Sequence, residues 1–202
     1  MKITHVFFDI GGVLGSNGWD HEQRERAASH FGLDLADLTE RHQETVGTLE
    51  AGRMSLDEYL DCVVFHAPRA FTRDDFRRFM FEQSTPHPDT IALARGLAAT
   101  GRYRLMTLNN ESAELNAYRV RHFGLREIFS AFFSSCWLGI TKPARRIYEI
   151  ALAVSQAEPA GAVFIDDRRK NLDPARALGM RVVHYSGAPR LAEDLAALDV
   201  TT

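Results

Sequence analysis

The residues best suited to chemistry are acids and amides at the ends of apolar, strand-like runs. They are Asp9, the pair Asn109–Asn110 and the pair Asp166–Asp167. Two adjacent carboxylates repel each other unless a cation lies near both, and Mg²⁺ is the common cation for hard oxygen ligands. Asp166–Asp167 therefore indicates a Mg²⁺ site. An equally weighted interpretation is that the pair begins the next helix and forms an ion pair with Arg168 or Arg169.

Lys142–Pro143 is a fourth candidate, since it follows one apolar run and precedes a helical one. A lysine held there could place its ammonium near a phosphate, or near carboxylates that need neutralising. The simpler interpretation is a solvated lysine. The functional interpretation therefore depends on all four sites lying together.

Strand and helix signals alternate along most of the chain, and the carboxyl ends of parallel strands are where open α/β sheets bind ligands. This alternation predicts an α/β fold with a doubly wound parallel sheet. Strands are expected at residues 3–8, 103–108, 131–135, 162–165 and 181–184. Helices are expected at residues 91–99, 112–122, 147–154, 172–178 and 191–198.

Residues 20–84 differ, because their apolar positions recur at helical spacing with no strand signal. About four helices are expected there, and Ser55 followed by Glu58 has the pattern of a capping box. We expect this block to be a small cap inserted into the core. The predicted boundaries are residues 1–14 and 87–202 for the core and 15–86 for the cap.

Composition restricts the class of protein further. The length of 202 residues suits one large domain or one domain with an insertion. The formal net charge of −3 argues against nucleic-acid or membrane partners. No apolar run approaches the roughly 20 residues of a membrane span. Cys62 and Cys136 are expected to be reduced core residues in a cytoplasmic protein. The sequence leaves open whether the protein is a monomer or a homodimer.

The ordered motifs resemble the haloacid dehalogenase-like hydrolase superfamily. They are Asp9-x-Gly11-Gly12-Val13-Leu14, Leu108–Asn109, Lys142–Pro143 and Asp166-Asp167-x-x-x-Asn171. The resemblance covers nearly the whole chain and implies a Rossmann-like core with a small helical cap after the first motif. Within the superfamily the chain is similar to glucose-1-phosphatases and to the N-terminal phosphatase domain of soluble epoxide hydrolases. Segments 135–148 and 171–180 carry this finer resemblance.

The resemblance implies a role for each matched residue. Asp9 would be the nucleophile that forms an aspartyl-phosphate, and Lys142 would neutralise the phosphoryl oxygens. Mg²⁺ would be held by Asp9, the backbone carbonyl of Gly11 and Asp167, with Asp166 as a further ligand or outer partner. The phosphate would be bound at positions Leu108 and Asn109, together with Lys142.

Two departures from the family pattern bear on activity. Gly11 stands where most of the family's phosphatases have an acid–base aspartate, a group worth roughly 10²–10⁴-fold in rate. Leu108 stands where the family has a Ser or Thr that binds phosphate. The adjacent Thr107 could serve only if the strand end is bulged or shifted, because successive side chains point to opposite faces.

The expected function is a Mg²⁺-dependent phosphatase for a small phosphorylated metabolite, such as a sugar phosphate or an acyl phosphate. The alternative is a weak or inactive relative that binds a phosphorylated ligand or a partner. A haloacid dehalogenase is a lesser alternative, since such enzymes need no metal and lack the Asp-Asp pair. Candidate specificity residues in the cap are Asn17, Trp19, His21 and the turn at residues 50–53, which includes Arg53. None of the eight histidines is assigned to a metal.

Overall fold

The centre of the molecule is a parallel β-sheet. The structure, a computed structural model, describes residues 2–202. Within them the strands are β1 (His5–Phe8), β2 (Arg104–Asn109), β3 (Ala131–Ser134), β4 (Ala162–Asp166) and β5 (Arg181–His184), in the spatial order β3-β2-β1-β4-β5. All neighbouring pairs are parallel. The predicted doubly wound α/β fold is confirmed.

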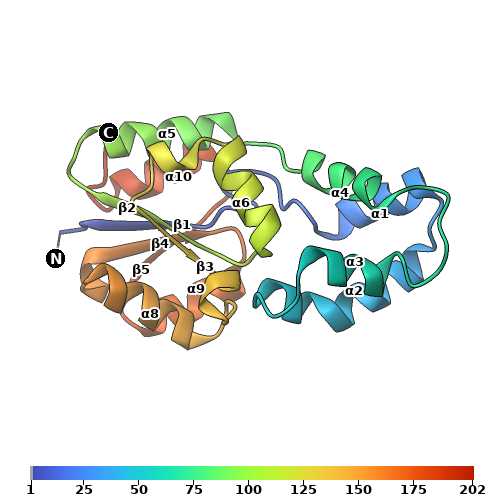
Figure 1. Cartoon of the computed structure of the whole chain (residues 1–202). Helices are drawn as coiled ribbons and strands as arrows, with labels where there is room; N and C mark the ends of the chain where they lie inside the picture. The colour runs from blue at the N-terminus through green and yellow to red at the C-terminus, as the bar shows by residue number, and fades with distance from the viewer. Residues whose placement is uncertain (1) are drawn as a thin grey trace.

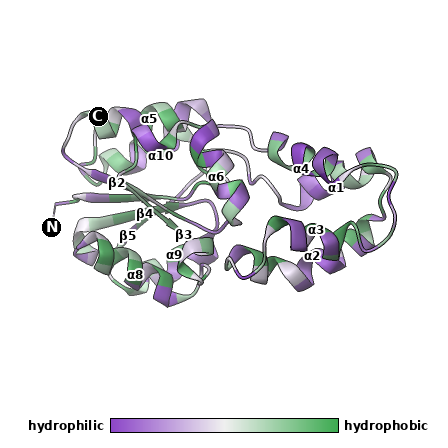
Figure 2. Ribbon diagram, in the orientation of Figure 1, coloured by the Kyte–Doolittle hydropathy of each residue, from purple (hydrophilic) through white to green (hydrophobic). Residues whose placement is uncertain are grey.

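Helices cover both faces of the sheet (Figure 1). One face carries α5 (Pro88–Ala99), α6 (Ala113–His122) and α10 (Ala188–Ala196), and the other carries α8 (Arg145–Ser155) and α9 (Arg169–Ala177). Successive strand residues point to opposite faces, so Phe8 packs in the first layer and Phe7 in the second. The strands therefore carry apolar side chains on both faces. In Figure 2, hydrophobic green runs through the strands of the sheet, with hydrophilic purple among it.

The predicted cap is a bundle of four helices that lies apart from the sheet (Figure 1). They are α1 (His21–Phe31), α2 (Leu35–Glu50), α3 (Leu56–Val63) and α4 (Arg73–Glu82). The bundle has its own apolar core, which includes Tyr59, Phe76 and Met80. Ser55 and Glu58 form the expected capping box, in which the Ser55 N–H donates to Glu58 Oε2 at 2.8 Å. The limits 15 and 86 remain a prediction.

The chain crosses between core and cap twice, and the two crossings are hydrogen-bonded to each other. The Ser16 N–H donates to the Thr85 carbonyl at 2.8 Å, and the His87 N–H donates to the Leu14 carbonyl at 2.9 Å. A side chain at Gly15 would place its Cβ 2.5 Å from Phe123 and 2.7 Å from the Thr85 carbonyl oxygen. Glycine at position 15 therefore allows the two crossings to lie together.

The structure corrects some of the sequence-based expectations. Cys136 is buried, but Cys62 is exposed, because α3 turns Leu60 and Val63 inward and position 62 outward. β3 ends at Ser134 rather than residue 135, since the unpredicted short helix α7 (Ser135–Leu138) begins there. Short 3₁₀ turns, η1 (Leu125–Glu127) and η2 (Pro159–Gly161), were also not predicted. No helix within residues 2–202 is long and apolar enough to cross a membrane.

Candidate active site

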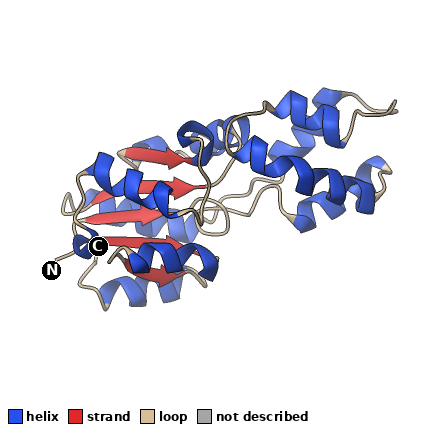
Figure 3. Ribbon diagram, turned by 90° about the horizontal axis from the view of Figure 1, so that it is seen from below, coloured by secondary structure: helices blue, strands red, loops and turns tan. Residues whose placement is uncertain are grey.

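Three carboxylates meet where the central strands end. Figure 3 shows the strands pointing toward the cap, so their carboxyl ends face it. Asp9 directly follows β1, Asp166 is the last residue of the neighbouring strand β4, and Asp167 comes next. Each of the three places a carboxylate oxygen within 4.8 Å of the others. The sequence prediction that these acids lie together is consistent with this geometry.

Lys142 lies between two of these acids. Its Nζ is 2.9 Å from Asp9 Oδ2 and 2.7 Å from Asp166 Oδ2, and all three side chains are buried. Burial opposes the charge on Lys142, but the two neighbouring carboxylates outweigh it and raise the pKa of the ammonium. Lys142 is therefore a charged residue of the site rather than a solvated lysine.

Asn110 positions the loop that carries Lys142. The Asn110 Nδ2 donates to the Lys142 carbonyl at 2.9 Å, and the Lys142 N–H donates to Asn110 Oδ1 at 2.8 Å. Because both backbone groups are satisfied by one side chain, the loop before α8 is fixed to the end of β2. The ammonium is thereby directed at the carboxylates.

Both carboxylate oxygens of Asp166 have hydrogen-bond partners. Besides Lys142, it accepts hydrogen bonds from the Arg168 N–H at 2.7 Å and from Asn171 Nδ2 at 3.1 Å. These contacts combine the two interpretations drawn from the sequence, since Asp166 satisfies a backbone donor near the start of α9 and also faces the site. The alternative ion pair of Asp166–Asp167 with Arg168 or Arg169 is not formed between these described residues. The Arg168 guanidinium instead reaches Asp20 at 2.7 Å.

Asp167 is the acid of the cluster that has an unpartnered carboxylate oxygen. Its Oδ1 is buried and has no hydrogen-bond partner among the described residues. Gly12 makes room for this carboxylate, because a Cβ at position 12 would lie 2.4 Å from Asp167 Oδ2. Gly12 also has φ +75°, a conformation that favours glycine. An unpartnered carboxylate oxygen next to two further acids fits a hard divalent cation, which would be held by Asp9 and Asp167, with Asp166 beside them.

Among residues 2–202, the site has three carboxyl groups and only one cationic side chain near them, Lys142. Burial and the charges of Asp166 and Asp167 raise the pKa of Asp9 to about 8, against the opposing effect of Lys142. Burial and Asp166 also raise the pKa of Asp167. One lysine therefore leaves the cluster short of positive charge.

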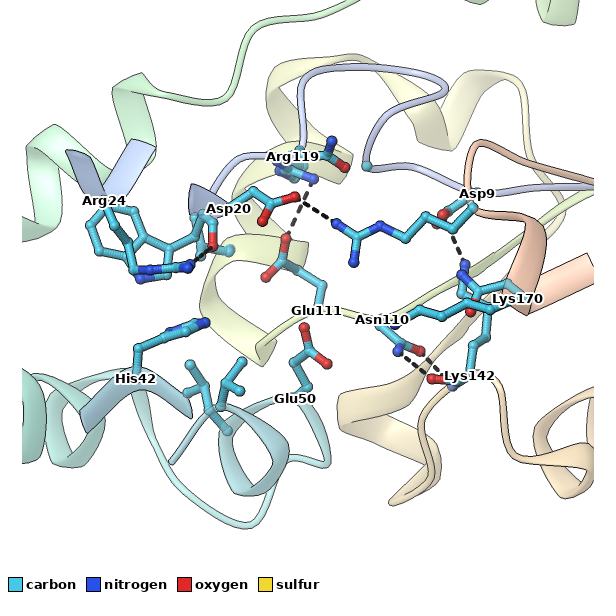
Figure 4. Close-up of a pocket in the computed structure, with 18 residues that line it drawn as sticks. Asp9, Asp20, Arg24, His42, Glu50, Asn110, Glu111, Arg119, Lys142 and Lys170 are labelled. Carbon is cyan, nitrogen blue, oxygen red and sulfur yellow. Dashed lines mark hydrogen bonds and ion pairs between the residues drawn. The ribbon is translucent and has the colours of Figure 1, made fainter. Parts of the chain in front are cut away.

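A cavity of about 290 Å³ opens beside the cluster, between the core and the cap (Figure 4). Thirteen of its wall residues carry polar or charged side chains. They are Asp9, Asn17, Asp20, Arg24, His42, Glu50, Asn110, Glu111, Arg119, Lys142, Arg168, Lys170 and Asn171. A cavity with such a wall can bind a hydrophilic, anionic ligand.

The predicted cap residues have different locations. Asn17 and Trp19 line the cavity, and Trp19 is also part of the cap core, where its Nε1 donates to the Tyr59 hydroxyl at 2.8 Å. His21 is on the surface, 3.1 Å from Glu25. Arg53 is outside the cavity wall, with Nη2 3.4 Å from the Gly139 carbonyl oxygen. Of the turn at residues 50–53, only Glu50 reaches the cavity.

Two of the three expected phosphate-binding residues lie outside the cavity wall. The Leu108 side chain is fully buried in the apolar layer with Phe7 and does not line the cavity. Asn109 is also outside the wall, because it is the last residue of β2 and its amide bonds Asn116 and Ser134. Its neighbour Asn110, one position beyond the strand, faces the cavity instead.

Thr107 does not line the cavity. It pairs with Phe8 in regular parallel register, and no bulge shifts the end of β2. Its Oγ1 is buried without a hydrogen-bond partner in the part of the chain that the structure describes, and the residue is not in the cavity wall. The regular alternation of the strand explains this result.

Sequence reasoning missed the roles of Glu111 and Arg119. Glu111 follows Asn110 after β2, so the same strand-end pattern that flagged the asparagines could have found it. Arg119 lies inside α6, and nothing in its spacing points to the cavity. The two side chains form a buried pair, with Arg119 Nη1 3.4 Å from Glu111 Oε2.

A family model described as haloacid dehalogenase-like hydrolase matches residues 3–179. The chain belongs to the haloacid dehalogenase-like hydrolases. Solved structures of this family have the same fold. A family hydrolase from Porphyromonas gingivalis matches with a TM-score of 0.79 at 22% identity, covering 100% of both chains. A family enzyme from Bacteroides thetaiotaomicron, solved with magnesium and inorganic phosphate, matches with a TM-score of 0.73 at 16% identity over 92% of this chain and 95% of that one.

Relatives of this hydrolase include proteins named as phosphatases. D-ribitol-5-phosphate phosphatase of Bacteroides thetaiotaomicron is 26% identical, covering 88% of this chain and 89% of the relative. Sesquiterpene phosphatase astK of Aspergillus oryzae is 27% identical, covering 90% and 89%. Bifunctional epoxide hydrolase 2 of Sus scrofa is 25% identical over 91% of this chain, which spans only 36% of that relative's length.

Proposed function

We propose that this hydrolase is a Mg²⁺-dependent phosphatase that removes phosphate from a small hydroxylated metabolite, with Asp9 as the nucleophile. The observation that carries the proposal is the cluster of Asp9, Asp166 and Asp167 around one lysine, with a buried Asp167 oxygen left unpartnered. Three carboxylates and one ammonium have a formal charge of −2, which one divalent cation balances. The Bacteroides thetaiotaomicron enzyme bound to magnesium and phosphate supports this assignment.

The proposed reaction is phosphoryl transfer by positioning and charge balance. The Ile10 N–H donates to Asp9 Oδ1 at 2.8 Å and Lys142 contacts Oδ2, so the carboxylate is oriented from both sides. Asp9 attacks phosphorus and the bond to the leaving oxygen breaks. Lys142 stays beside the transferred group and offsets its negative charge. When bound, Mg²⁺ would supply further stabilisation of that charge.

The cavity wall favours a hydroxylated substrate over an isoprenoid one. Charged and amide side chains make up most of the wall, and the apolar members are few. Burying a hydrocarbon chain against them would desolvate charged groups without replacing their hydrogen bonds. Substrates such as sugar or polyol phosphates, or acyl phosphates with polar tails, therefore fit better than the sesquiterpene class named for the Aspergillus oryzae relative.

The test is phosphate release with excess Mg²⁺ across a panel of sugar 1-phosphates, polyol phosphates and acyl phosphates. We expect turnover by the wild type that is abolished in Asp9→Asn, because the amide keeps the shape of the side chain and removes the nucleophile. Asp74→Asn, an exposed acid on α4, is the matched control and should retain full activity. If no panel member is turned over faster than by Asp9→Asn, the phosphatase assignment is wrong.

A non-catalytic binding protein is the second candidate, and two positions favour it. Gly11 supplies no acid–base side chain, and Leu108 directs its side chain into the core instead of toward a phosphate. Mg²⁺ binding would not separate the two candidates, because both would keep the carboxylates. Absent turnover combined with saturable binding of inorganic phosphate would support the binding protein.

A further inference from the structure

The residue that would donate a proton to the leaving group is missing from the first motif. Gly11 lines the cavity, and a Cβ built there would lie 3.4 Å from Arg119 Nη1 and 3.5 Å from Asn17 Oδ1. A cationic guanidinium therefore borders the place where an acid would project. If a simple alkoxide is to leave, its proton must come from another residue of the cavity wall.

Most acids of the wall already have partners. Asp20 is ion-paired with Arg168 at 2.7 Å, and Glu111 pairs with Arg119 at 3.4 Å. Asp9 is committed as the nucleophile. The carboxyl of Glu50 has no hydrogen bond and no ion pair with any residue in 2–202 that the structure describes. Glu50 is therefore the acid of the wall that can exchange a proton without breaking an existing contact.

The backbone that carries this carboxyl is fixed to the core. Glu50 is the last residue of α2, and its carbonyl accepts a hydrogen bond from Ser135 Oγ at 2.6 Å. The same hydroxyl accepts from the Glu111 N–H at 3.1 Å, so one serine joins the cap to the loop after β2. Gly52 packs so tightly on α7 that a Cβ there would lie 2.0 Å from the Cys136 carbonyl oxygen. Figure 4 shows Glu50 projecting from the cap side toward Glu111, whose carboxylate is directed at Arg119.

We propose that Glu50, supplied by the cap, is the catalytic proton donor that takes the role left vacant at Gly11. This inference rests on the proposed phosphatase function. As Asp9 attacks phosphorus, the bond between phosphorus and the leaving oxygen breaks. The proton of the Glu50 carboxyl passes to that oxygen, so the products are an alcohol, a phosphorylated Asp9 and a Glu50 carboxylate. A water molecule then gives a proton to the Glu50 carboxylate while the water oxygen attacks phosphorus. This step releases phosphate and restores Asp9.

The surroundings of Glu50 suit a proton donor at neutral pH. Burial and the negative charge of Glu111 raise the pKa of Glu50 to about 7, against the opposing charges of Arg168 and Lys142. Its position at the negative end of α2 acts in the same direction. The charged and titratable groups that face it from other elements are Tyr59, Glu111, Arg119, Lys142, Arg168 and Lys170.

The experiment compares leaving groups of similar size and increasing basicity: p-nitrophenyl, phenyl and benzyl phosphate. The quantity is kcat/KM, which covers the steps up to departure of the alcohol. We expect Glu50→Gln to lower kcat/KM for benzyl phosphate by roughly 10²–10⁴-fold. For p-nitrophenyl phosphate the change should be below about threefold, since a good leaving group needs little proton donation. Glu44→Gln, exposed on the same helix, is the matched control.

The pH profile is the second readout. Because the protonated carboxyl is the active form, wild-type kcat/KM for benzyl phosphate should fall as pH rises through about 7. Glu50→Gln should lack this fall, and Glu50→Asp should restore part of both the rate and the profile. A role confined to structure would not produce this dependence on leaving group and pH.

The outcomes separate the two proposals. Equal losses for all three substrates in Glu50→Gln, or an unchanged pH profile, would overturn the proton-donor role while leaving the phosphatase assignment intact. A wild-type enzyme that hydrolyses p-nitrophenyl phosphate but not benzyl phosphate would also overturn the proton-donor role. Failure of wild type and Asp9→Asn to differ on every substrate would overturn the phosphatase assignment and this inference together.

Discussion

At the scale of single residues, the site depends on how closely Asp167 can approach its neighbours. The carboxylate occupies the space that a side chain at position 12 would fill, 2.4 Å from an ideal Cβ. A glycine is needed there for a steric reason and for a conformational one, and the two reasons can be separated experimentally.

Gly12→Ala should displace Asp167 and weaken Mg²⁺ binding by about 10–100-fold, the range seen when the support of a metal ligand is disturbed. Isothermal titration of the protein with Mg²⁺ measures the effect. Gly101→Ala is the control, since Gly101 has a similar φ of +65° but open space around its Cβ. Equal Mg²⁺ affinity in the two variants would show that Gly12 does not act through Asp167.

Sequence patterns identified the acids and the lysine of the site but not Glu111 or Arg119. Asp9, Asp166 and Lys142 could be predicted because each lies at or near the end of an apolar strand or in a family motif. Arg119 could not, since it reaches the cavity from inside a helix. The family resemblance pointed to Asn109, but β2 extends to that residue, so Asn110 is the one that follows the strand and lines the cavity.

At the scale of elements, the end of α2 is attached to the core by one hydroxyl. Ser135 Oγ donates to the Glu50 carbonyl and accepts from the Glu111 N–H. Both backbone groups lose a partner when that hydroxyl is removed, and unsatisfied buried polar groups cost roughly 1–3 kcal/mol.

Ser135→Ala should therefore lower the free energy of unfolding by about 1–3 kcal/mol, measured by urea denaturation. It should also lower kcat/KM for benzyl phosphate more than for p-nitrophenyl phosphate, because the backbone that carries the Glu50 carboxyl loses its anchor. Ser155→Ala is the control, since that hydroxyl bonds only the Ala151 and Leu152 carbonyls within α8. A stability loss without any dependence on leaving group would argue against positioning of Glu50.

At the scale of the whole molecule, Arg119 ties three parts of the chain together. It donates to the Ser16 carbonyl at 2.8 Å and to Ser84 Oγ at 3.1 Å, next to the two crossings between core and cap. It also forms an ion pair with Glu111. Burial raises the pKa of the Glu111 carboxyl. Arg119 is 2% exposed, so these contacts are shielded from solvent.

Arg119→Met should lower the free energy of unfolding by about 3–5 kcal/mol, because Glu111 becomes an uncompensated buried charge. Adding Glu111→Gln should recover part of the loss. Urea denaturation of the two single variants and the double variant gives the coupling between the residues. Strictly additive losses would show that the pair does not act as a unit.

The order of strands and helices followed from the chain's alternating patterns because apolar strands and amphipathic helices have distinct periods. Short α7 and the 3₁₀ turns were missed, since three or four residues carry too little periodicity. How the cap meets the core was also beyond the patterns. It depends on contacts such as that of Gly52 with Cys136, which join residues far apart in the chain.

The hydrogen bond between Ser16 and Thr85 means that the inserted helices leave and re-enter the core at one point. A segment attached in this way behaves as an exchangeable module. Any helical insert whose two ends lie equally close together could replace it without rethreading the sheet. Since Asp9, Lys142 and the acid pair all belong to the recipient part, exchanging the insert would replace the cap side of the cavity wall, including Glu50, and leave the nucleophile, the lysine and the acid pair in place.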